Sequence, residues 1–450
     1  MSAVATAIRN WVKDRHFRLL LKNSGYLAGS QVVAALAGIV TVAFAGRSLG
    51  IVMFGMLVLI NSYAQAVSGF SKFQSWQLVV RYGAPAIARG DLATFKRATG
   101  FALGLDIVSG VAGMIIGIAL LPLVAQGVGI SDSYIGGAIL YCTLLPMMAA
   151  ATPTGVLRTL QRFDLVSWQG TSTPIARAIL VAIAWATHAS FQVFLLIWYV
   201  TALAGDCFLW FLAWRELQRR GLLSGLRPAL RPSNLDGGWR FAINVNLNTT
   251  LLTVSGPVAR LIVGSLLGPA GAALYRAASS LADAVRKPAD LLLKAYYPQI
   301  TTMNFRSKTP WKLMVRTASL TGAAALIAGL LLVLFGQDII TAVFGETFAP
   351  AYSPLLVLLL VPIIGMISFP ITPMLYALDR SEAPLRARVV GTVLYLLLIF
   401  PLSARFGLIG AAAAAAAGYA ISVGITAMSL ASEHRRLRAA KQIKKAAGCP

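Results

Sequence analysis

The sequence has few charged residues, three cysteines and three histidines. Charged residues make up 12% of its 450 residues, whereas soluble domains contain about a quarter. So few charges cannot keep a folded chain of this length in water, so most of it must face lipid. Cys142, Cys207 and Cys449 are isolated from one another, which excludes a disulfide framework. The histidines are equally scattered, so we expect no metal site, no cofactor and no Ser/His/Asp arrangement.

Long apolar runs are abundant instead. Hydrophobic residues make up 58% of the chain, and the mean hydropathy is +0.74. A helix needs roughly 20 apolar residues to cross a bilayer core about 30 Å thick. The sequence therefore predicts an all-α membrane protein of about twelve transmembrane helices, with prolines interrupting the fourth and fifth. The predicted spans are 24–46, 50–71, 99–124, 134–157, 165–187, 190–214, 241–265, 268–295, 316–336, 351–377, 387–404 and 407–431.

The distribution of basic residues predicts the orientation. If the N-terminus is cytoplasmic, most of the 39 Lys and Arg residues fall in cytoplasmic segments, which is the usual positive-inside pattern. Both termini are therefore predicted to lie in the cytoplasm. Residues 1–23 are basic and lack an apolar core, so we interpret them as a cytoplasmic amphipathic segment and not as a removable signal peptide. Basic clusters beside anionic lipid headgroups explain the net charge of +24 without nucleic acid.

The two longest polar insertions, 72–98 and 215–240, alternate basic and apolar residues, which predicts amphipathic helices on the inner membrane surface. The second lies near the middle of the chain and is predicted to link two six-helix bundles, 24–214 and 241–432, before a basic cytoplasmic tail, 433–450. Sliding the chain along itself aligns Gly46, Leu49 and Gly50 with Gly264, Leu267 and Gly268. This repeat predicts two parallel, pseudo-symmetric halves, and transporters built this way bind substrate between their halves.

The predicted span 268–295 carries a row of polar side chains. Its members are three or four residues apart, which places them on one face of a helix. A charged group at bilayer depth costs roughly 2.5–3.5 kcal/mol, so such a row is stable only against water, an opposite charge or a polar ligand. The row therefore predicts the lining of a polar cavity. It consists of Arg276, Ser280, Asp283, Lys287, Asp290 and Lys294.

The preceding span, 241–265, repeats this spacing and ends in a short Gly268-Pro269 turn, so both polar faces can line one cavity. They include Asn246, Thr250, Thr253, Pro257 and Arg260. Arginine offers a rigid fork of donors suited to phosphate, and pyrophosphate on a lipid carrier is a ligand of this kind. The predicted pyrophosphate-binding residues are Arg260, Arg276, Arg286 and Lys287.

The polar face of the first half is mostly neutral and suits sugar hydroxyls. The predicted glycan-binding residues are Asn61, Gln65, Lys72, Asn246 and Thr250. Asp283 is the candidate proton or sodium carrier, because its protonation would change the charge of the cavity. Arg177 is the comparable deep charge of the first half and is predicted to contribute to the cavity.

Structural roles compete with these assignments. The cytoplasmic members of the row can extend to the membrane surface or pair along the helix. Arg276 and Asp283 can form a buried ion pair, and Arg260 can contact lipid headgroups. Arg177 can neutralise a carboxylate, either Asp106 or Asp206.

Two segments carry a resemblance to a known family. One includes Phe54-Gly55, Ser62-Tyr63-Ala64-Gln65 and Ser68-Gly69-Phe70-Ser71-Lys72; the other includes Leu267-Gly268-Pro269-Ala270, Leu274-Tyr275-Arg276 and Ser279-Ser280-Leu281-Ala282-Asp283. They resemble bacterial polysaccharide biosynthesis proteins of the Wzx flippase type, in the multidrug/oligosaccharidyl-lipid/polysaccharide exporter superfamily.

The resemblance implies two six-helix bundles around a central cationic cavity in the bacterial inner membrane. It implies transport and not enzymatic catalysis: an undecaprenyl-pyrophosphate-linked oligosaccharide moves from the cytoplasmic to the periplasmic leaflet, for synthesis of O-antigen, capsule or exopolysaccharide. The implied partners are the lipid-linked oligosaccharide, membrane lipids, and glycan polymerase and chain-length proteins.

Three alternatives remain. A cation-coupled multidrug exporter of the same superfamily would favour deep acidic residues, whereas the deep charges here are mainly basic. A polysaccharide polymerase or ligase would need a large periplasmic loop, and the longest outward link, 337–350, with Asp338 and Glu346, is too short. A non-transporting partner of glycosyltransferases would not need a polar cavity.

Overall fold

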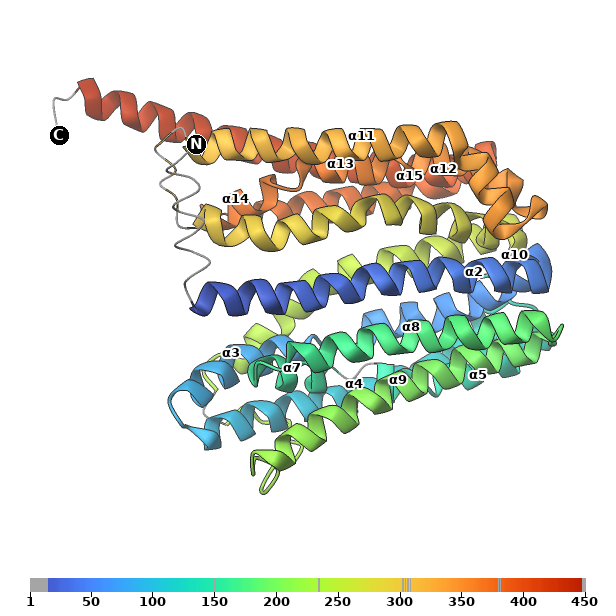
Figure 1. The fold of residues 1–450 in the computed structure, drawn as a ribbon, viewed down its shortest axis with the longest axis horizontal. Helices are drawn as coiled ribbons and strands as arrows, with labels where there is room; N and C mark the ends of the chain where they lie inside the picture. Colours follow the sequence, from blue (N-terminus) through green and yellow to red (C-terminus); the bar gives the residue numbers. More distant parts are fainter. Residues whose placement is uncertain are drawn as a thin grey trace. The chain divides into compact units, whose positions relative to one another are not determined.

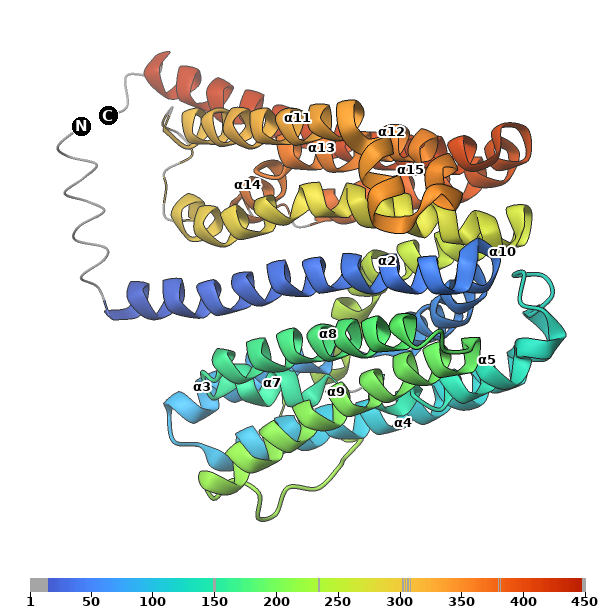
Figure 2. The ribbon, with the colours of Figure 1, turned by 45° about the vertical axis from the view of Figure 1, so that its right-hand side comes forward.

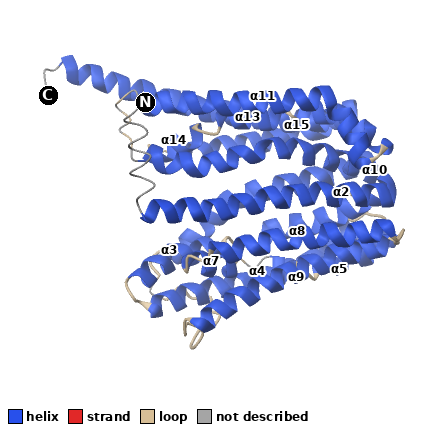
Figure 3. Cartoon of the chain, in the orientation of Figure 1, coloured by secondary structure: helices blue, strands red, loops and turns tan. Residues whose placement is uncertain are grey.

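A computed structural model describes residues 15–446, except 149–150, 234, 302, 304, 306, 308, 379 and 381. Its helical side chains are described except at 15–28, 244–245, 247–249, 251–253, 287–295, 297–299, 301 and 438–446. The described secondary structure is entirely helical (Figure 3). The predicted all-α class is therefore confirmed.

Three long helices are each interrupted at a glycine. They are α2 (Arg15–Ser71), α10 (Gly238–Thr301) and α15 (Glu382–Ala446), which break at Gly50 (φ 68°), Gly268 (φ 70°) and Gly407 (φ 58°). Glycine has no Cβ and adopts a positive φ without steric penalty. Each long helix is therefore two helices joined directly at a kink, which corresponds to two consecutive predicted spans.

The remaining predicted spans also have helical counterparts. Among the described residues, seven helices are long and apolar enough to cross a membrane, and the bent pair Asp132–Cys142 and Leu145–Thr159 makes eight. Division of α2, α10 and α15 at their glycines, together with α8 (Phe163–Ala186), then gives one helical segment for each of the twelve predicted spans. Pro174 does not interrupt α8, contrary to the sequence-based expectation.

The chain forms two compact units, 1–273 and 274–450. This boundary follows the kink in α10, whereas the predicted boundary between six-helix halves lies at 215–240. In the first unit, α2 packs along α8, and α8 packs against α9 (Phe191–Arg219). Figures 1 and 2 show α8 beside both neighbours. The division into two six-helix halves at the basic linker stays a prediction.

The fourth predicted span is broken into short pieces: the 3-10 helix Asp132–Tyr134, α5 (Ile135–Cys142), α6 (Leu145–Met148) and α7 (Thr152–Thr159). Pro153 lies in the first turn of α7, where proline is tolerated because that N–H has no partner within the helix. The interruption predicted for this span is therefore present.

The sequence predicted an amphipathic helix for the basic linker 215–240, but this prediction is wrong: the segment is mainly an ordered loop. Helix α9 ends at Arg219, and the described residues 222–237 are non-helical; Pro228 and Pro232 each lack the N–H that a helix needs. Leu222 and Leu235 are buried in a core shared with α3 (Ser75–Ala88) and α4 (Leu92–Val124). The predicted surface helix 72–98 is likewise incorrect as one element, because residue 92 already begins α4.

Three hydrogen bonds fix the linker to these helices. The Lys96 ammonium donates to the Ser224 carbonyl at 2.7 Å, the Tyr82 hydroxyl to the Asp236 carbonyl at 2.7 Å, and the Ala229 N–H to the Gly100 carbonyl at 2.9 Å.

The second unit consists of the remainder of α10, α11 (Thr309–Phe344), the 3-10 helix Glu346–Ala351, α12 (Tyr352–Leu358), α13 (Leu360–Ser368), α14 (Ile371–Ala377) and α15. Helices α12, α13 and α14 all pack against α15, and α13 also packs against α11. The link after α11 is short, because the 3-10 helix begins two residues after Phe344.

Candidate functional site

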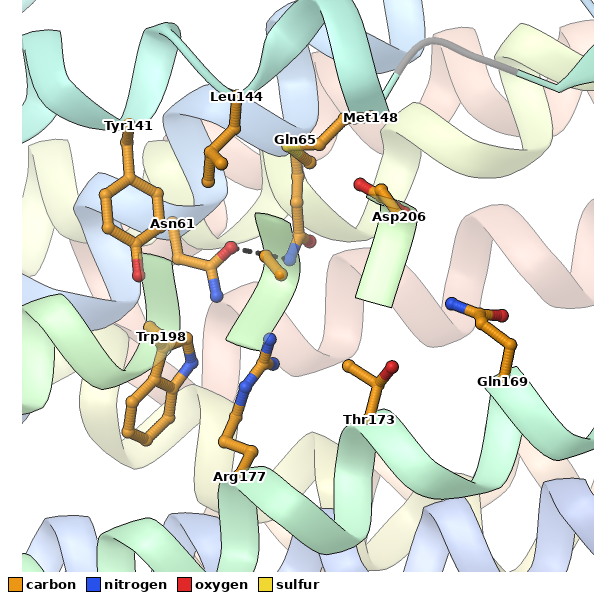
Figure 4. A pocket seen from close by; sticks show the side chains of 11 residues that line it. Asn61, Gln65, Tyr141, Leu144, Met148, Gln169, Thr173, Arg177, Trp198 and Asp206 are labelled. Atoms are coloured by element: carbon orange, nitrogen blue, oxygen red, sulfur yellow. Dashed lines mark hydrogen bonds between the residues drawn. The ribbon is translucent and has the colours of Figure 1, made fainter. Parts of the chain in front are cut away.

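The first unit contains a polar cavity of about 280 Å³ (Figure 4). Helices α2, α8 and α9 and the broken segment 135–148 contribute its walls. A single water needs only roughly 10–15 Å³, whereas small-ligand pockets measure roughly 300–1,000 Å³, so the cavity lies at the lower end of the sizes that hold a small molecule. It is lined by Asn61, Gln65, Tyr141, Leu144, Met148, Gln169, Thr173, Arg177, Trp198, Ala202 and Asp206.

Arg260 is hydrogen-bonded to two side chains of α2, one of the helices that line the cavity. Its Nε donates to the Ser62 Oγ at 2.7 Å, and a terminal nitrogen donates to the Gln65 Oε1 at 3.0 Å. Gln65 in turn donates from Nε2 to the Asn61 Oδ1 at 2.8 Å. The arginine therefore fixes the orientation of both amides. The predicted phosphate ligand Arg260 and the predicted sugar ligands Asn61 and Gln65 form one connected network.

Arg177 lies on the opposite wall and points into the cavity (Figure 4). Its Nε donates to the Thr201 Oγ1 at 2.8 Å, and its guanidinium carbon lies 5.7 Å from the centre of the Trp198 ring. Asp206 attracts both Arg177 and Lys72 electrostatically. The neutralising partner that the sequence offered for Arg177 is therefore Asp206, although the two side chains form no ion pair in the described structure.

Asp106, the other candidate partner of Arg177, is occupied elsewhere. Its side chain is buried, and one carboxylate oxygen accepts hydrogen bonds from the N–H groups of Ala151 and Thr152, both at 2.8 Å. Its other oxygen accepts from the Ser75 hydroxyl at 2.5 Å. A carboxylate at a helix N-terminus satisfies unpaired N–H groups and opposes the helix dipole. Asp106 therefore stabilises the start of α7.

Lys72 acts on the other side of the same break. Its ammonium donates to the Met148 carbonyl, the last of α6, at 2.8 Å. A cation at a helix C-terminus is the favourable counterpart of an anion at an N-terminus. Lys72 is not among the residues that line the cavity, and its role in glycan binding stays a prediction.

The polar row of α10 is only partly described. Arg276 is partly buried and experiences the charge of Asp283, whereas the side chains of Asp283 and Arg286 are exposed. The Thr250 hydroxyl lies 3.5 Å from the Asn246 Oδ1, a long contact. The side chains of Lys287, Asp290, Lys294 and Thr253 lie outside the described residues.

Gln169, Thr173 and Trp198 line the cavity but were not predicted from the sequence, although their spacing from the predicted Arg177 and from Asp206 offered a signal. Gln169, Thr173 and Arg177 are four residues apart on α8, and Trp198 and Asp206 are eight apart on α9. Both sets therefore lie on single helical faces. Among the described residues, no group of three or more His, Cys, Asp or Glu could hold a metal ion.

The fold is that of the transporters of the multidrug/oligosaccharidyl-lipid/polysaccharide superfamily. An inward-facing MATE-family multidrug resistance transporter of that superfamily matches 91% of this chain and 95% of its own, with a TM-score of 0.71 and 14% identity. A mutant of the Vibrio cholerae MATE transporter VcmN matches 93% of this chain and 97% of its own, with a TM-score of 0.61 and 13% identity.

The sequence defines the family more narrowly. Residues 20–304 match the polysaccharide biosynthesis protein family. The inner membrane protein YghQ of Escherichia coli (strain K12) is 38% identical over 348 residues, which cover 77% of this chain and 98% of the relative. The chain is a multi-pass membrane protein that belongs to the polysaccharide biosynthesis protein family.

Proposed function

We propose that the protein is a flippase that moves a pyrophosphate-linked oligosaccharide on a polyprenyl carrier from the cytoplasmic to the periplasmic leaflet of the bacterial inner membrane. Both termini then lie in the cytoplasm. The family, which is one of transport proteins, and the inner-membrane relative support this proposal. Its partners are the lipid-linked glycan and membrane lipids, with a glycan polymerase and chain-length proteins acting after transport.

The observation that carries the proposal is the contact of Arg260 with neutral acceptors. Ser62 and Gln65, which are both neutral, each accept one hydrogen bond from the guanidinium. A charged phosphate oxygen accepts a stronger hydrogen bond than a neutral hydroxyl or amide oxygen does. A pyrophosphate can therefore replace these acceptors, and the Gln65 amide, once released, can bind a sugar hydroxyl.

In the proposed transport cycle, the cations along α10 bind the anion one after another. In the inward-open state, Arg286 and Lys287 capture the pyrophosphate while the polyprenyl tail stays in lipid. Conversion to the outward-open state then transfers the anion to Arg276 and Arg260, while the glycan, bound by Asn61, Gln65, Asn246 and Thr250, crosses in a polar environment. Asp283 is the proposed coupling site for a proton or sodium ion, since its charge acts on Arg276.

The membrane potential assists this direction of movement. One elementary charge crossing 100 mV is worth about 2.3 kcal/mol, and the exterior is positive. Outward movement of an anion is therefore favourable even before an ion is coupled to it.

A cation-coupled drug exporter is the second candidate, because Asp206 faces the cavity and the solved structures of the same fold include multidrug transporters. Arg177 offsets the charge of Asp206 in the same cavity, which disfavours an organic cation. A polymerase or ligase is disfavoured by the short link between Phe344 and Glu346.

Complementation of a flippase-deficient strain tests the proposal. At matched expression, Arg260→Ala and Arg276→Ala are expected to abolish surface glycan, and Arg276→Lys to retain part of it. Arg405→Ala is the control, because Arg405 is not one of the proposed substrate-binding residues and its guanidinium lies over the Phe406 ring. In proteoliposomes, the leaflet of a fluorescent lipid-linked oligosaccharide is read by a membrane-impermeant quencher. Full transport by the Arg260→Ala/Arg276→Ala double variant would refute the mechanism.

A further inference from the structure

The cavity of the first unit contains a cation that has unused donors. Thr201 anchors the Arg177 guanidinium through Nε, and Trp198 lies beside it. Figure 4 shows the terminal nitrogens directed into the cavity. Within the described residues, these nitrogens donate no hydrogen bond to the protein. A guanidinium held at one edge therefore presents its remaining donors to whatever occupies the cavity.

The same cavity contains a carboxylate with unused acceptors. Asp206 lies eight residues after Trp198 on α9, at the other end of the lining (Figure 4), and in the described part of the chain it accepts no hydrogen bond. Lys72 and Arg177 act on it only through their electrostatic attraction. Asp206 is partly buried, and a partly buried charge without a direct partner is unfavourable. A ligand that donates hydrogen bonds to the carboxylate would therefore stabilise the arrangement.

The charges and the lining together define the class of ligand. Arg177 and Asp206 are the two charged residues of the lining and carry opposite charges, which favours an occupant without net charge; a pyrophosphate would be repelled by Asp206 and an organic cation by Arg177. Neighbouring hydroxyls of a sugar ring can donate to both oxygens of a carboxylate and accept from an arginine. Tyr141 and Trp198 give an apolar wall on one side, and Asn61 and Gln65 add amide groups.

We propose that this cavity is a subsite for one uncharged pyranose ring of the transported glycan. Asp206 accepts hydrogen bonds from neighbouring ring hydroxyls, Arg177 donates to a ring or hydroxyl oxygen, and Trp198 covers the apolar face of the ring. The inference rests on the proposed function and adds to it the charge of the sugar and the place where one unit binds. The cavity volume of about 280 Å³ is of the size of one monosaccharide ring.

Site-directed labelling tests the subsite independently of transport. The full-length protein, with Cys207→Ala and Cys449→Ala, carries Ala202→Cys in the cavity wall and is reacted with a small maleimide in detergent. Methyl α-glucoside is expected to slow this reaction in proportion to its occupancy, whereas inorganic pyrophosphate and methyl glucuronide are not. With Asp206→Ala added, the half-protecting concentration of the glucoside is expected to rise about tenfold or more, equivalent to about 1.4 kcal/mol or more.

The outcomes separate this inference from the proposed function. Ser224→Cys, in the linker, is the control, and its labelling should not respond to the sugar. Protection by pyrophosphate, stronger protection by the glucuronide than by the glucoside, or no protection by the glucoside would each overturn the subsite. Transport without glucoside protection would refute the subsite alone. Glucoside protection that requires Asp206, in a protein that transports no lipid-linked glycan, would keep the sugar site and refute the flippase.

Discussion

The buried carboxylate of Asp106 gives a sharp prediction about the broken segment 132–159. Its three hydrogen bonds connect α4 to the start of α7 and to Ser75 of α3. Asp106→Ala removes the acceptor and leaves two backbone N–H groups without a partner. Each unsatisfied buried group costs about 1–3 kcal/mol, so for two groups we expect a loss of about 2–6 kcal/mol in the free energy of unfolding.

Asp106→Asn is the informative second variant. The amide oxygen can still accept from Ala151 and Thr152, and its NH₂ group can donate to Ser75. Only the charge is lost, and a hydrogen bond to a charged group is worth about 1 kcal/mol more than a neutral one. We therefore expect Asp106→Asn to cost about 1–2 kcal/mol, clearly less than Asp106→Ala.

The measurement is equilibrium unfolding of the purified full-length protein in mixed micelles of increasing SDS content, followed by tryptophan fluorescence. Asp132→Ala is the control, because Asp132 is exposed and its side-chain contacts in the described structure are with Gln126, at 3.3 Å; such surface changes stay within about 0.5 kcal/mol. The Ser75→Ala/Asp106→Ala double variant should lose less than the sum of the two single losses. Equal losses for the alanine and asparagine variants would refute the role given to the carboxylate.

Three further predictions concern packing, an ion-pair cluster and the other side of the helix break. Gly55→Ala should destabilise the protein by about 1–3 kcal/mol, because an added Cβ would overlap the Pro269 carbonyl. Gly38→Ala is the control and should be neutral or slightly stabilising, because there is open space around Gly38. Equal effects of the two variants on SDS unfolding would contradict this. Arg162→Ala should destabilise the fold, because Arg162 donates to Asp164 and to the buried Glu216 at 2.7 Å. The hydrogen bond from Arg162 lowers the pKa of Asp164. The stabilisation that Asp164 contributes is therefore present above its unfolded pKa of about 3.9 and is lost as the pH falls through the lower folded pKa. A stability difference between wild type and Arg162→Ala that grows on acidification would contradict this. Lys72→Met should lower stability through loss of the contact with the Met148 carbonyl; SDS unfolding identical to that of the wild type would contradict this role.

The fold was largely predictable because its dominant signals are local. Apolar length identified the spans, and the glycines of the aligned repeat, Gly50 and Gly268, are the positions where α2 and α10 break. The linker was misinterpreted because alternating basic and apolar residues suit a surface helix, while Pro228 and Pro232 and the burial of Leu222 and Leu235 favour a loop packed on α3 and α4.

The candidate site was only partly predictable. Periodicity identified Arg260, Asn61 and Gln65 on separate helices, but not that one hydrogen-bonded network joins them. Asp206 was considered only as a partner for Arg177, and Trp198 resembled any apolar residue of a span. Their place around one cavity depends on how α8 and α9 pack against α2, which distant sequence positions do not reveal.

The three hydrogen bonds that fasten residues 224–236 to α3 and α4 change what this connection can do. A loop of that length without such contacts would be flexible and would let the helices on either side move independently. Here the residues just before α10 are held against α3 by the Tyr82–Asp236 hydrogen bond. Proteolytic cleavage between Arg227 and Ala229 should therefore leave the start of α10 in place. Any large hinge movement must then come from the glycine and proline positions within α10 and not from the stretch of chain that precedes it.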